Sequence, residues 1–126
     1  MFKKDTRILV VDDEKVVRDL VRCVLKEEGY KVLTASNGRA ALGRMSHSDT
    51  DLVLLDIKMP GIDGLQVLER IRRYSDIPVI ILTGIDEITS LNKALGIGAD
   101  DYITKPFSKR ELIARIKAKL RRAKPS

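Results

Sequence analysis

The stretch LVLLDIKMPGIDG, residues 52–64, decides the fold, because an unbroken apolar run ends at a carboxylate and a Met-Pro-Gly turn follows. Four consecutive aliphatic residues, 52–55, predict a strand that is covered on both faces, as in a parallel sheet between helices. Asp56 lies where this strand would leave the core. An aspartate at such a point either opens a turn by hydrogen-bonding nearby backbone or serves as a reactive group.

Four further runs have strand character, and amphipathic segments separate them. The predicted strands are RILVV (7–11), KVLTA (31–35), DLVLL (51–55), PVIIL (78–82) and DYITK (101–105). The predicted helices cover 14–28, 38–46, 64–73 and 87–96, with caps at Asn37 and Asp63, and a last helix begins at Ser108 with a capping box to Glu111. Strict alternation of strands and helices predicts an α/β fold, a doubly wound parallel sheet of five strands flanked by five helices.

Apolar residues at helical spacing predict which helix faces cover the sheet. The segment 14–28 places six aliphatic side chains on one stripe: Val16, Val17, Leu20, Val21, Val24 and Leu25. The segment 87–96 presents Ile88, Leu91 and Leu95 in the same way. Cys23 lies at helical spacing among the first set, so we expect a packed or bordering thiol.

Length and composition are those of one soluble domain. The 126 residues suit a single core. No apolar stretch approaches the roughly 20 residues that cross a bilayer. Asp12 and Asp13 interrupt the first apolar run, so no signal peptide is predicted. A single cysteine excludes an internal disulfide and fits a reducing compartment, and we expect a cytoplasmic protein with no membrane partner.

The net charge of +6 is concentrated at the carboxyl end of the sequence. Residues 109–124 hold eight basic side chains and one acidic one, whereas the rest of the chain carries a net −1. A basic helix can follow phosphates, but no aromatic side chains interleave with these charges to stack on bases. We therefore interpret this segment as a solvated helix face leading into a basic tail or linker over 121–126, and not as a nucleic-acid site.

Polar side chains follow the predicted strands at their carboxyl ends. The first strand is followed by Asp12 and Asp13, the third by Asp56, the fourth by Thr83, and the fifth ends at Lys105. In open parallel sheets this edge holds the ligand crevice. Three carboxylates close together repel one another, and oxygen ligands with room for water favour Mg²⁺. A carboxylate beside Mg²⁺ and a lysine is placed to attack phosphorus, which would give an aspartyl phosphate.

Four blocks, VVDDE (10–14), LLDIKMPGIDG (54–64), ILTG (81–84) and GADDYITKPF (98–107), closely resemble the receiver domain of two-component response regulators. The resemblance covers residues 7–121. It implies a flavodoxin-like sheet of strand order 2-1-3-4-5. It also implies a receiver domain over 1–120, with 121–126 as a tail or the start of a linker to an output domain.

The resemblance also implies roles for the residues at this edge. Asp56 would be the phosphoacceptor, with Asp13 a direct Mg²⁺ ligand, Asp12 acting through water, and the backbone carbonyl of Lys58 completing the protein ligands. Thr83 and Lys105 would hold the phosphoryl oxygens.

A switch residue and a set of partners follow from the same resemblance. Tyr102 would be the switch aromatic, and the Lys105–Pro106 bond would be cis. The implied function is a switch that takes a phosphoryl group from a sensor histidine kinase and changes the surface made by its fourth helix, fifth strand and fifth helix. It would assist its own phosphorylation and dephosphorylation without acting on a separate substrate. An output domain or target protein, and a homodimer formed on phosphorylation, are the partners it allows.

Three alternative functions compete with this interpretation. A haloacid-dehalogenase-type phosphatase would use Asp56 as nucleophile but needs a second aspartate two positions later, where Lys58 stands. A nucleotide-binding module lacks its glycine-rich loop, because GIGADD (96–101) closes a helix. Nucleic-acid binding through the basic helix is the third. The last helix resembles receivers that drive winged-helix domains, yet Leu91 and Ala94 depart from that pattern, so the output stays open.

Overall fold

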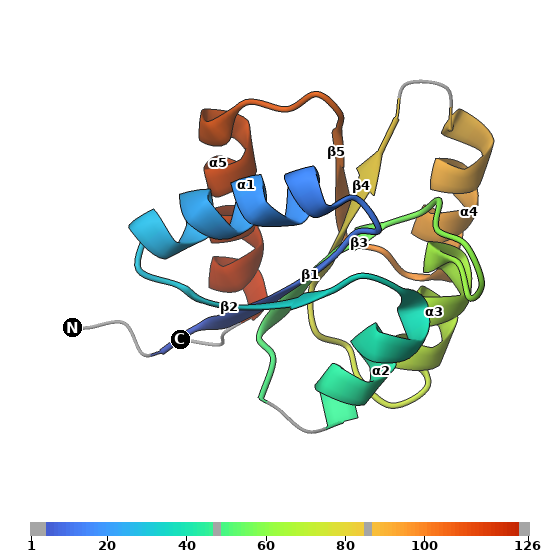
Figure 1. Ribbon diagram of the computed structural model, residues 1–126. Helices are drawn as coiled ribbons and strands as arrows, with labels where there is room; N and C mark the ends of the chain where they lie inside the picture. The colour runs from blue at the N-terminus through green and yellow to red at the C-terminus, as the bar shows by residue number, and fades with distance from the viewer. Residues whose placement is uncertain (1–4, 47–48, 85–86, 124–126) are drawn as a thin grey trace.

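The computed structural model describes residues 5–46, 49–84 and 87–123. Within these ranges, side chains are described up to residue 121. Strands and helices alternate strictly along these residues (Figure 1). The strands are β1 (Arg7–Val11), β2 (Lys31–Ala35), β3 (Leu52–Asp56), β4 (Val79–Thr83) and β5 (Asp101–Thr104). The helices are α1 (Lys15–Glu27), α2 (Gly38–Ser46), α3 (Gly64–Arg72), α4 (Ile88–Ile97) and α5 (Lys109–Ala123).

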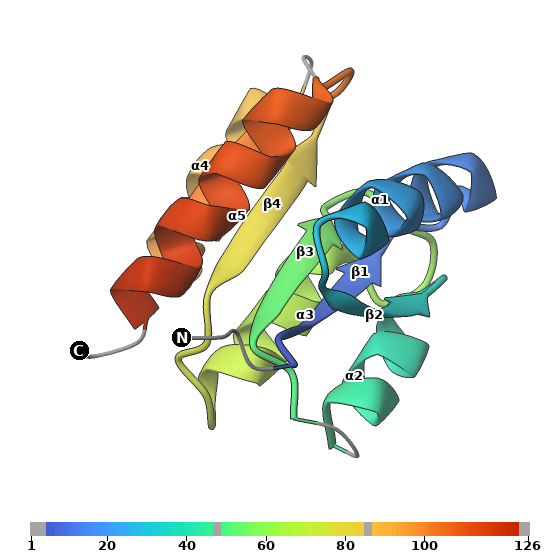
Figure 2. The same ribbon diagram turned by 90° about the vertical axis from the view of Figure 1, so that its left-hand side faces the viewer.

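The strands form one parallel sheet in the order β2-β1-β3-β4-β5, which confirms the predicted fold class. Figure 2 shows the arrowheads of β1, β3 and β4 at the same end of the molecule. Neighbouring strands end at nearly the same level, since Val11 pairs with Leu55, Asp56 with Leu82, and Thr83 with Thr104. The carboxyl ends of β1, β3, β4 and β5 therefore lie side by side.

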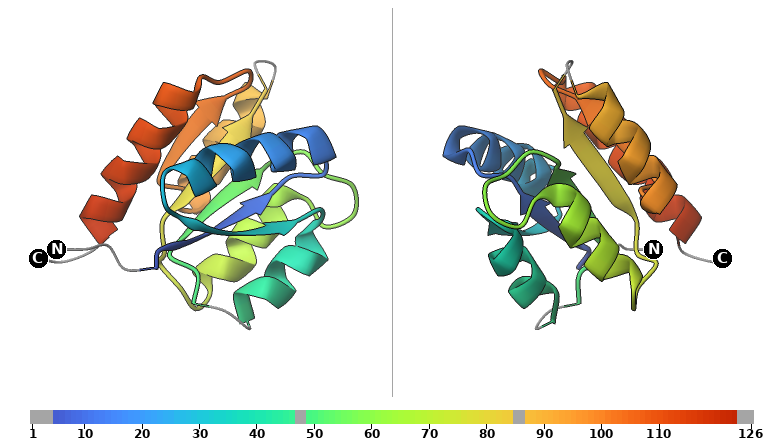
Figure 3. Two further views of the ribbon diagram at one scale, coloured as in Figure 1. Left: turned by 60° about the vertical axis from the view of Figure 1, so that its left-hand side comes forward. Right: turned by 90° about the vertical axis from the view of Figure 1, so that its right-hand side faces the viewer.

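Two hydrophobic cores lie on the two faces of the sheet. Ile8, Val10, Leu52, Leu54 and Ile80 point toward α1 and α5, and the alternate residues of the same strands point toward α2, α3 and α4. Figures 2 and 3 show α1 and α5 on one side of the sheet and α3 and α4 on the other. Burial on both faces explains why β3 and β4 are apolar at every position before the site, instead of alternating.

The structure corrects the predicted apolar stripes. Val16 is 78% exposed and Leu20 53% exposed, so on α1 only Val21 and Leu25 are fully buried. The helix covers one edge of the sheet through a narrower face than the six-residue stripe suggested. On α4, Leu91 is buried whereas Ile88 and Leu95 are exposed, and Ala94 takes the second core position. Cys23 is exposed and is not a packed thiol.

From β1 to β5, every element boundary lies within one residue of the predicted one, and side-chain caps are present at the predicted positions. The Asp63 carboxylate accepts from the Gln66 N–H at 3.0 Å, and the Gln66 side chain accepts from the Asp63 N–H, also at 3.0 Å. Asn37 caps α2 through the Ala40 N–H at 2.8 Å. Ser108 accepts from the Glu111 N–H at 3.0 Å, which is one half of the predicted capping box, while the Glu111 carboxylate pairs with Arg115. Helix α5 continues to Ala123, three residues into the segment predicted as a tail. None of the described helices is long and apolar enough to span a membrane.

Gly64 fixes the approach of α3 to the end of β3. The Gly64 N–H donates to the Ile57 carbonyl at 2.9 Å. A Cβ at this position would lie 2.3 Å from the Asp56 carbonyl oxygen and 2.7 Å from the Ile57 Cα. Both of these are backbone atoms, which cannot move away as the tip of a flexible side chain can. Only a residue without a side chain therefore allows the start of α3 to pack this closely against the backbone of Asp56 and Ile57.

We predict that Gly64→Ala lowers the free energy of unfolding by about 1–3 kcal/mol, because the added methyl group displaces the β3–α3 backbone. Gly43→Ala is the matched control: Gly43 is exposed within α2, and a Cβ added there would have nothing within 4 Å, so helix propensity should stabilise the protein by about 0.5–1 kcal/mol. Urea unfolding of both variants measures the difference, and equal effects would contradict this account of Gly64.

Candidate functional site

The functional side chains predicted from the sequence come from the ends of separate strands. Asp12 follows β1, Asp56 ends β3, Thr83 ends β4, and Lys105 follows β5. The parallel register brings these ends together at the edge seen at the upper right of the sheet in Figure 1. Asp12 and Lys105, although 93 residues apart in the sequence, are joined by a hydrogen bond of 2.9 Å.

Three carboxylates form a cluster at this edge. Asp12, Asp13 and Asp56 each offer an oxygen, and these oxygens lie within 4.8 Å of one another. Asp12 and Asp56 are buried, whereas Asp13 is exposed. Both Asp12 oxygens have partners, since Oδ1 accepts from the Glu14 N–H at 3.0 Å and Oδ2 accepts from Lys105. The cluster is thus an acidic site with one side open to solvent through Asp13.

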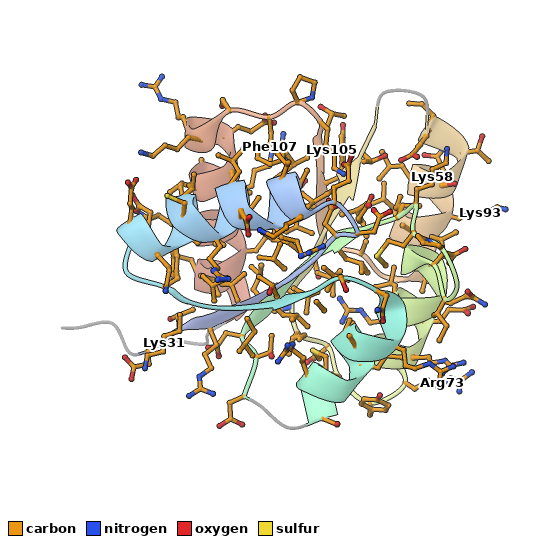
Figure 4. All side chains as sticks on the ribbon, in the orientation of Figure 1. Lys31, Lys58, Arg73, Lys93, Lys105 and Phe107 are labelled. Atoms are coloured by element: carbon orange, nitrogen blue, oxygen red, sulfur yellow. The ribbon has the colours of Figure 1, made fainter. Side chains whose placement is uncertain are left out.

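Lys105 supplies positive charge within the cluster. Its Nζ lies 2.9 Å from Asp12 Oδ2, 3.7 Å from Asp56 Oδ1 and 3.8 Å from Glu14 Oε1. Figure 4 labels it just beyond the end of β5. The Lys105 N–H donates to the Thr83 carbonyl at 2.8 Å, and the Lys105–Pro106 bond is cis, as the sequence predicted. Burial lowers the pKa of the ammonium group, but its hydrogen bond with Asp12 and the charges of the nearby carboxylates outweigh burial and raise that pKa overall.

The pKa of Asp56 shows the electrostatic cost of this crowding. Desolvation, followed by repulsion from Asp12, raises the pKa of its carboxyl group from 3.8 to about 7, although Lys105 and a backbone hydrogen bond from Lys58 act in the opposite direction. One lysine therefore does not neutralise the cluster. A further cation would relieve the repulsion that remains.

The donor set fits a hard divalent cation. The oxygens that converge here are carboxylate oxygens, and no histidine or cysteine belongs to the cluster among the residues the structure describes. Oxygen-only ligands, few in number and open to water on one side, suit Mg²⁺ better than a transition metal or a fully enclosed Ca²⁺. Asp12, Asp13 and Asp56 could therefore hold a metal ion. The contribution of the Lys58 carbonyl stays a prediction.

Thr83 is buried at the end of β4, but its hydroxyl contacts residues other than Asp56. It lies 3.2 Å from the Gly84 carbonyl and 3.4 Å from Glu87 Oε1. Glu87 also accepts from the Gly84 N–H at 3.1 Å and pairs through Oε2 with Lys58 Nζ at 3.3 Å. Figure 4 shows Lys58 beside α4. Sequence reasoning missed Glu87. A carboxylate four residues after Thr83, just before the fourth helix, was the available signal.

Tyr102 is 38% exposed on β5, and its ring lies under the guanidinium of Arg115 at 5.7 Å from the ring centroid. The Arg115 guanidinium forms ion pairs with the Asp101 carboxylate at 2.7 Å and with the Glu111 carboxylate at 3.3 Å. The tyrosine therefore points outward, toward α5, in this structure. The sequence located Tyr102 but not Arg115, because nothing in the spacing of α5 distinguishes that arginine from its basic neighbours.

Comparison with known proteins gives a consistent result. The family model described as response regulator receiver domain matches residues 8–117. A receiver domain protein from Clostridium thermocellum is 32% identical, with 93% of this chain and 95% of that chain covered and a TM-score of 0.88. The receiver domain of NtrX from Brucella abortus is 38% identical, with 90% and 98% covered and a TM-score of 0.86. Against a longer NtrX chain, solved with ADP, the match covers 94% of this chain and 28% of the other, at 35% identity and a TM-score of 0.89.

We predict that Asp56→Asn stabilises the metal-free protein at pH 8 by about 2–4 kcal/mol and has little effect at pH 4. Because the folded-state pKa of Asp56 is raised to about 7, folding favours its protonated form. The contribution of the Asp56 carboxyl group to the free energy of unfolding is fully present below its pKa in the unfolded chain, near 4. This contribution is lost as the pH rises through 7.

Thermal unfolding at the two pH values in the presence of a chelator checks this prediction. Asp76→Asn, at an exposed aspartate, is the control and should change stability equally at both pH values. A stability gain for Asp56→Asn that does not depend on pH would show that the cost of ionising Asp56, from burial and from repulsion, is not its cause.

Proposed function

The chain belongs to the response regulator receiver family, whose members are signalling switches and not conventional enzymes, and from this membership we propose that Asp56 is its phosphoacceptor. The observation that carries the proposal is the position of Asp56, which is buried at the end of β3, clustered with Asp12 and Asp13, and 3.7 Å from the Lys105 ammonium. This carboxylate therefore lies near a cation and near oxygens that could hold a metal ion. Phosphoryl transfer depends mainly on such positioning and charge neutralisation.

The proposed reaction takes a phosphoryl group from a phosphohistidine of a sensor histidine kinase. A carboxylate oxygen of Asp56 attacks phosphorus, the bond from phosphorus to the imidazole nitrogen breaks, and the imidazole leaves with the electron pair. Lys105 stabilises the charge on the phosphoryl oxygens. Water later attacks phosphorus and returns the carboxylate and inorganic phosphate, so the domain assists its own phosphorylation and dephosphorylation without acting on a separate substrate.

Mg²⁺ is the proposed cofactor, held by Asp12, Asp13, Asp56 and the backbone carbonyl of Lys58. When bound, it neutralises carboxylate and phosphoryl charge. Asp13 is exposed whereas both Asp12 oxygens already have partners, which supports Asp13 as the direct ligand and Asp12 as a ligand through water. The raised pKa of Asp56 supports a requirement for the cation, since Asp56 attacks only as a carboxylate.

The proposed output is a change in the surface of α4, β5 and α5. Thr83 would turn its hydroxyl from Glu87 to the phosphoryl group, and Tyr102 would exchange its place under Arg115 for the space that Thr83 leaves. The hydroxyl of Thr83 starts from weak contacts, because its distances of 3.2 Å from the Gly84 carbonyl and 3.4 Å from Glu87 are both long for a hydroxyl donor. A two-state rearrangement of this kind alters which partner binds.

The wider setting belongs to the same proposal. Residues 1–120 would be the receiver unit and 121–126 a basic tail or the start of a linker, in a cytoplasmic protein with an output domain or target protein as partner and a homodimer on phosphorylation. The basic side chains of α5 favour a structural role for this helix over nucleic-acid binding. Four of them are already paired with acids of α5, β5 or the carboxyl end of α1: Lys109, Arg115, Lys117 and Lys119.

We predict that a small acyl phosphate with Mg²⁺ adds one phosphoryl group to the protein, and that intact-mass spectrometry detects it. The adduct should be absent in Asp56→Asn and in the presence of a chelator. Asp51→Asn, at a carboxylate that accepts from the Arg7 N–H before β3, is the control and should retain the adduct. An adduct on Asp56→Asn would contradict the assignment of the phosphoacceptor.

A further inference from the structure

Glu87 contacts two segments of the chain, one that follows β3 and one at the end of β4. Its side chain is only 10% exposed. One carboxylate oxygen accepts from the Gly84 N–H at 3.1 Å and lies 3.4 Å from the Thr83 hydroxyl, and the other lies 3.3 Å from the Lys58 ammonium. Glu87 thereby connects the segment after β3 to the residues that lead from β4 into α4, where it is the N-cap residue.

The two donors that Glu87 engages both come from segments next to Asp56. Lys58 follows Asp56 by two residues, and Thr83 ends the strand whose Leu82 pairs with Asp56. A phosphoryl group on Asp56 would offer both donors several strongly accepting oxygens. Glu87 and the phosphoryl group therefore compete for the same ammonium and the same hydroxyl.

The strength of these contacts suits a restraint that phosphorylation can release. Lys58 is 72% exposed, so breaking its ion pair returns a solvated cation to water at little cost. The Thr83 hydroxyl lies 3.4 Å from Glu87 and 3.2 Å from the Gly84 carbonyl, and both contacts are longer than a strong hydroxyl hydrogen bond. Glu87 itself keeps the Gly84 N–H as a partner when both donors leave. The restraint is therefore weak enough to open and specific enough to bias the resting arrangement.

We propose that Glu87 is a positioning residue that holds Thr83 and Lys58 away from Asp56 in the resting domain, so that phosphorylation must draw both from it. This inference rests on the proposed function, in which Asp56 is the phosphoacceptor. Because coupling between two events is reciprocal, a phosphoryl group that takes these donors also removes the contacts of Glu87 with Lys58 and Thr83 at the start of α4. Glu87 thus links occupancy of Asp56 to the helix whose surface carries the output.

The test measures initial rates of phosphorylation by acetyl phosphate with Mg²⁺, followed by intact mass. Glu87→Gln keeps an oxygen for the Gly84 N–H but removes the charge that holds Lys58, and we expect it to raise the rate about 5-fold. Glu27→Gln is the matched control. It removes a surface ion pair of 3.2 Å with Lys109, between exposed side chains on α1 and α5, and should leave the rate unchanged.

A double-mutant cycle separates this restraint from a general effect on the loop. In a Lys58→Met background, Glu87→Gln should change the rate by less than about 2-fold, because the ammonium that it releases is absent. A rate for Glu87→Gln at or below that of the unmodified protein would overturn the inference, and so would an equal gain in both backgrounds. Failure of the proposed function looks different, because then no variant forms the adduct, and neither does the unmodified protein.

Discussion

The structure depends on a charge imbalance at one edge of its sheet. Asp12, Asp13 and Asp56 are brought together where the strands end, and Lys105 supplies a cation that contacts Asp12 and approaches Asp56. Burial of the carboxyl group, together with the repulsion that remains, raises the pKa of Asp56 to about 7. Hydrophobic burial of β1 and β3 on both faces holds the two buried carboxylates in place despite this repulsion. The site is therefore a region where the fold stores unfavourable electrostatic energy that a cation can relieve.

Much of this arrangement could be predicted from the sequence, because it follows from strand direction. Once three apolar runs are interpreted as doubly covered strands, a parallel sheet is required, and its carboxyl ends must meet. Asp56 and Lys105 could then be assigned to one edge without any coordinates. The caps at Asn37 and Asp63 were equally accessible, since capping depends on local spacing that the sequence displays directly.

Other features depend on tertiary packing and could not be predicted in the same way. Helical spacing gives the direction of an apolar stripe but not the width of the surface that it covers, which is why Val16 and Leu20 are exposed. The direction in which a hydroxyl or a ring points depends on neighbours from other elements. Thr83 contacts Glu87 and Tyr102 lies under Arg115, and neither partner is marked by a motif. The sequence located the residues of the proposed switch, and packing determined their resting positions.

The separation of 93 residues between Asp12 and Lys105 has a consequence for assembly of the protein. No short fragment contains both the acidic pair and the lysine that approaches it, and β5 is the last strand of this sheet to be synthesised. Until that strand joins the edge of the sheet, the aspartates at the ends of β1 and β3 lack this internal cation. The acidic cluster and its lysine therefore come together only after β5 has been synthesised and has joined the sheet, so a shorter nascent chain lacks the complete site.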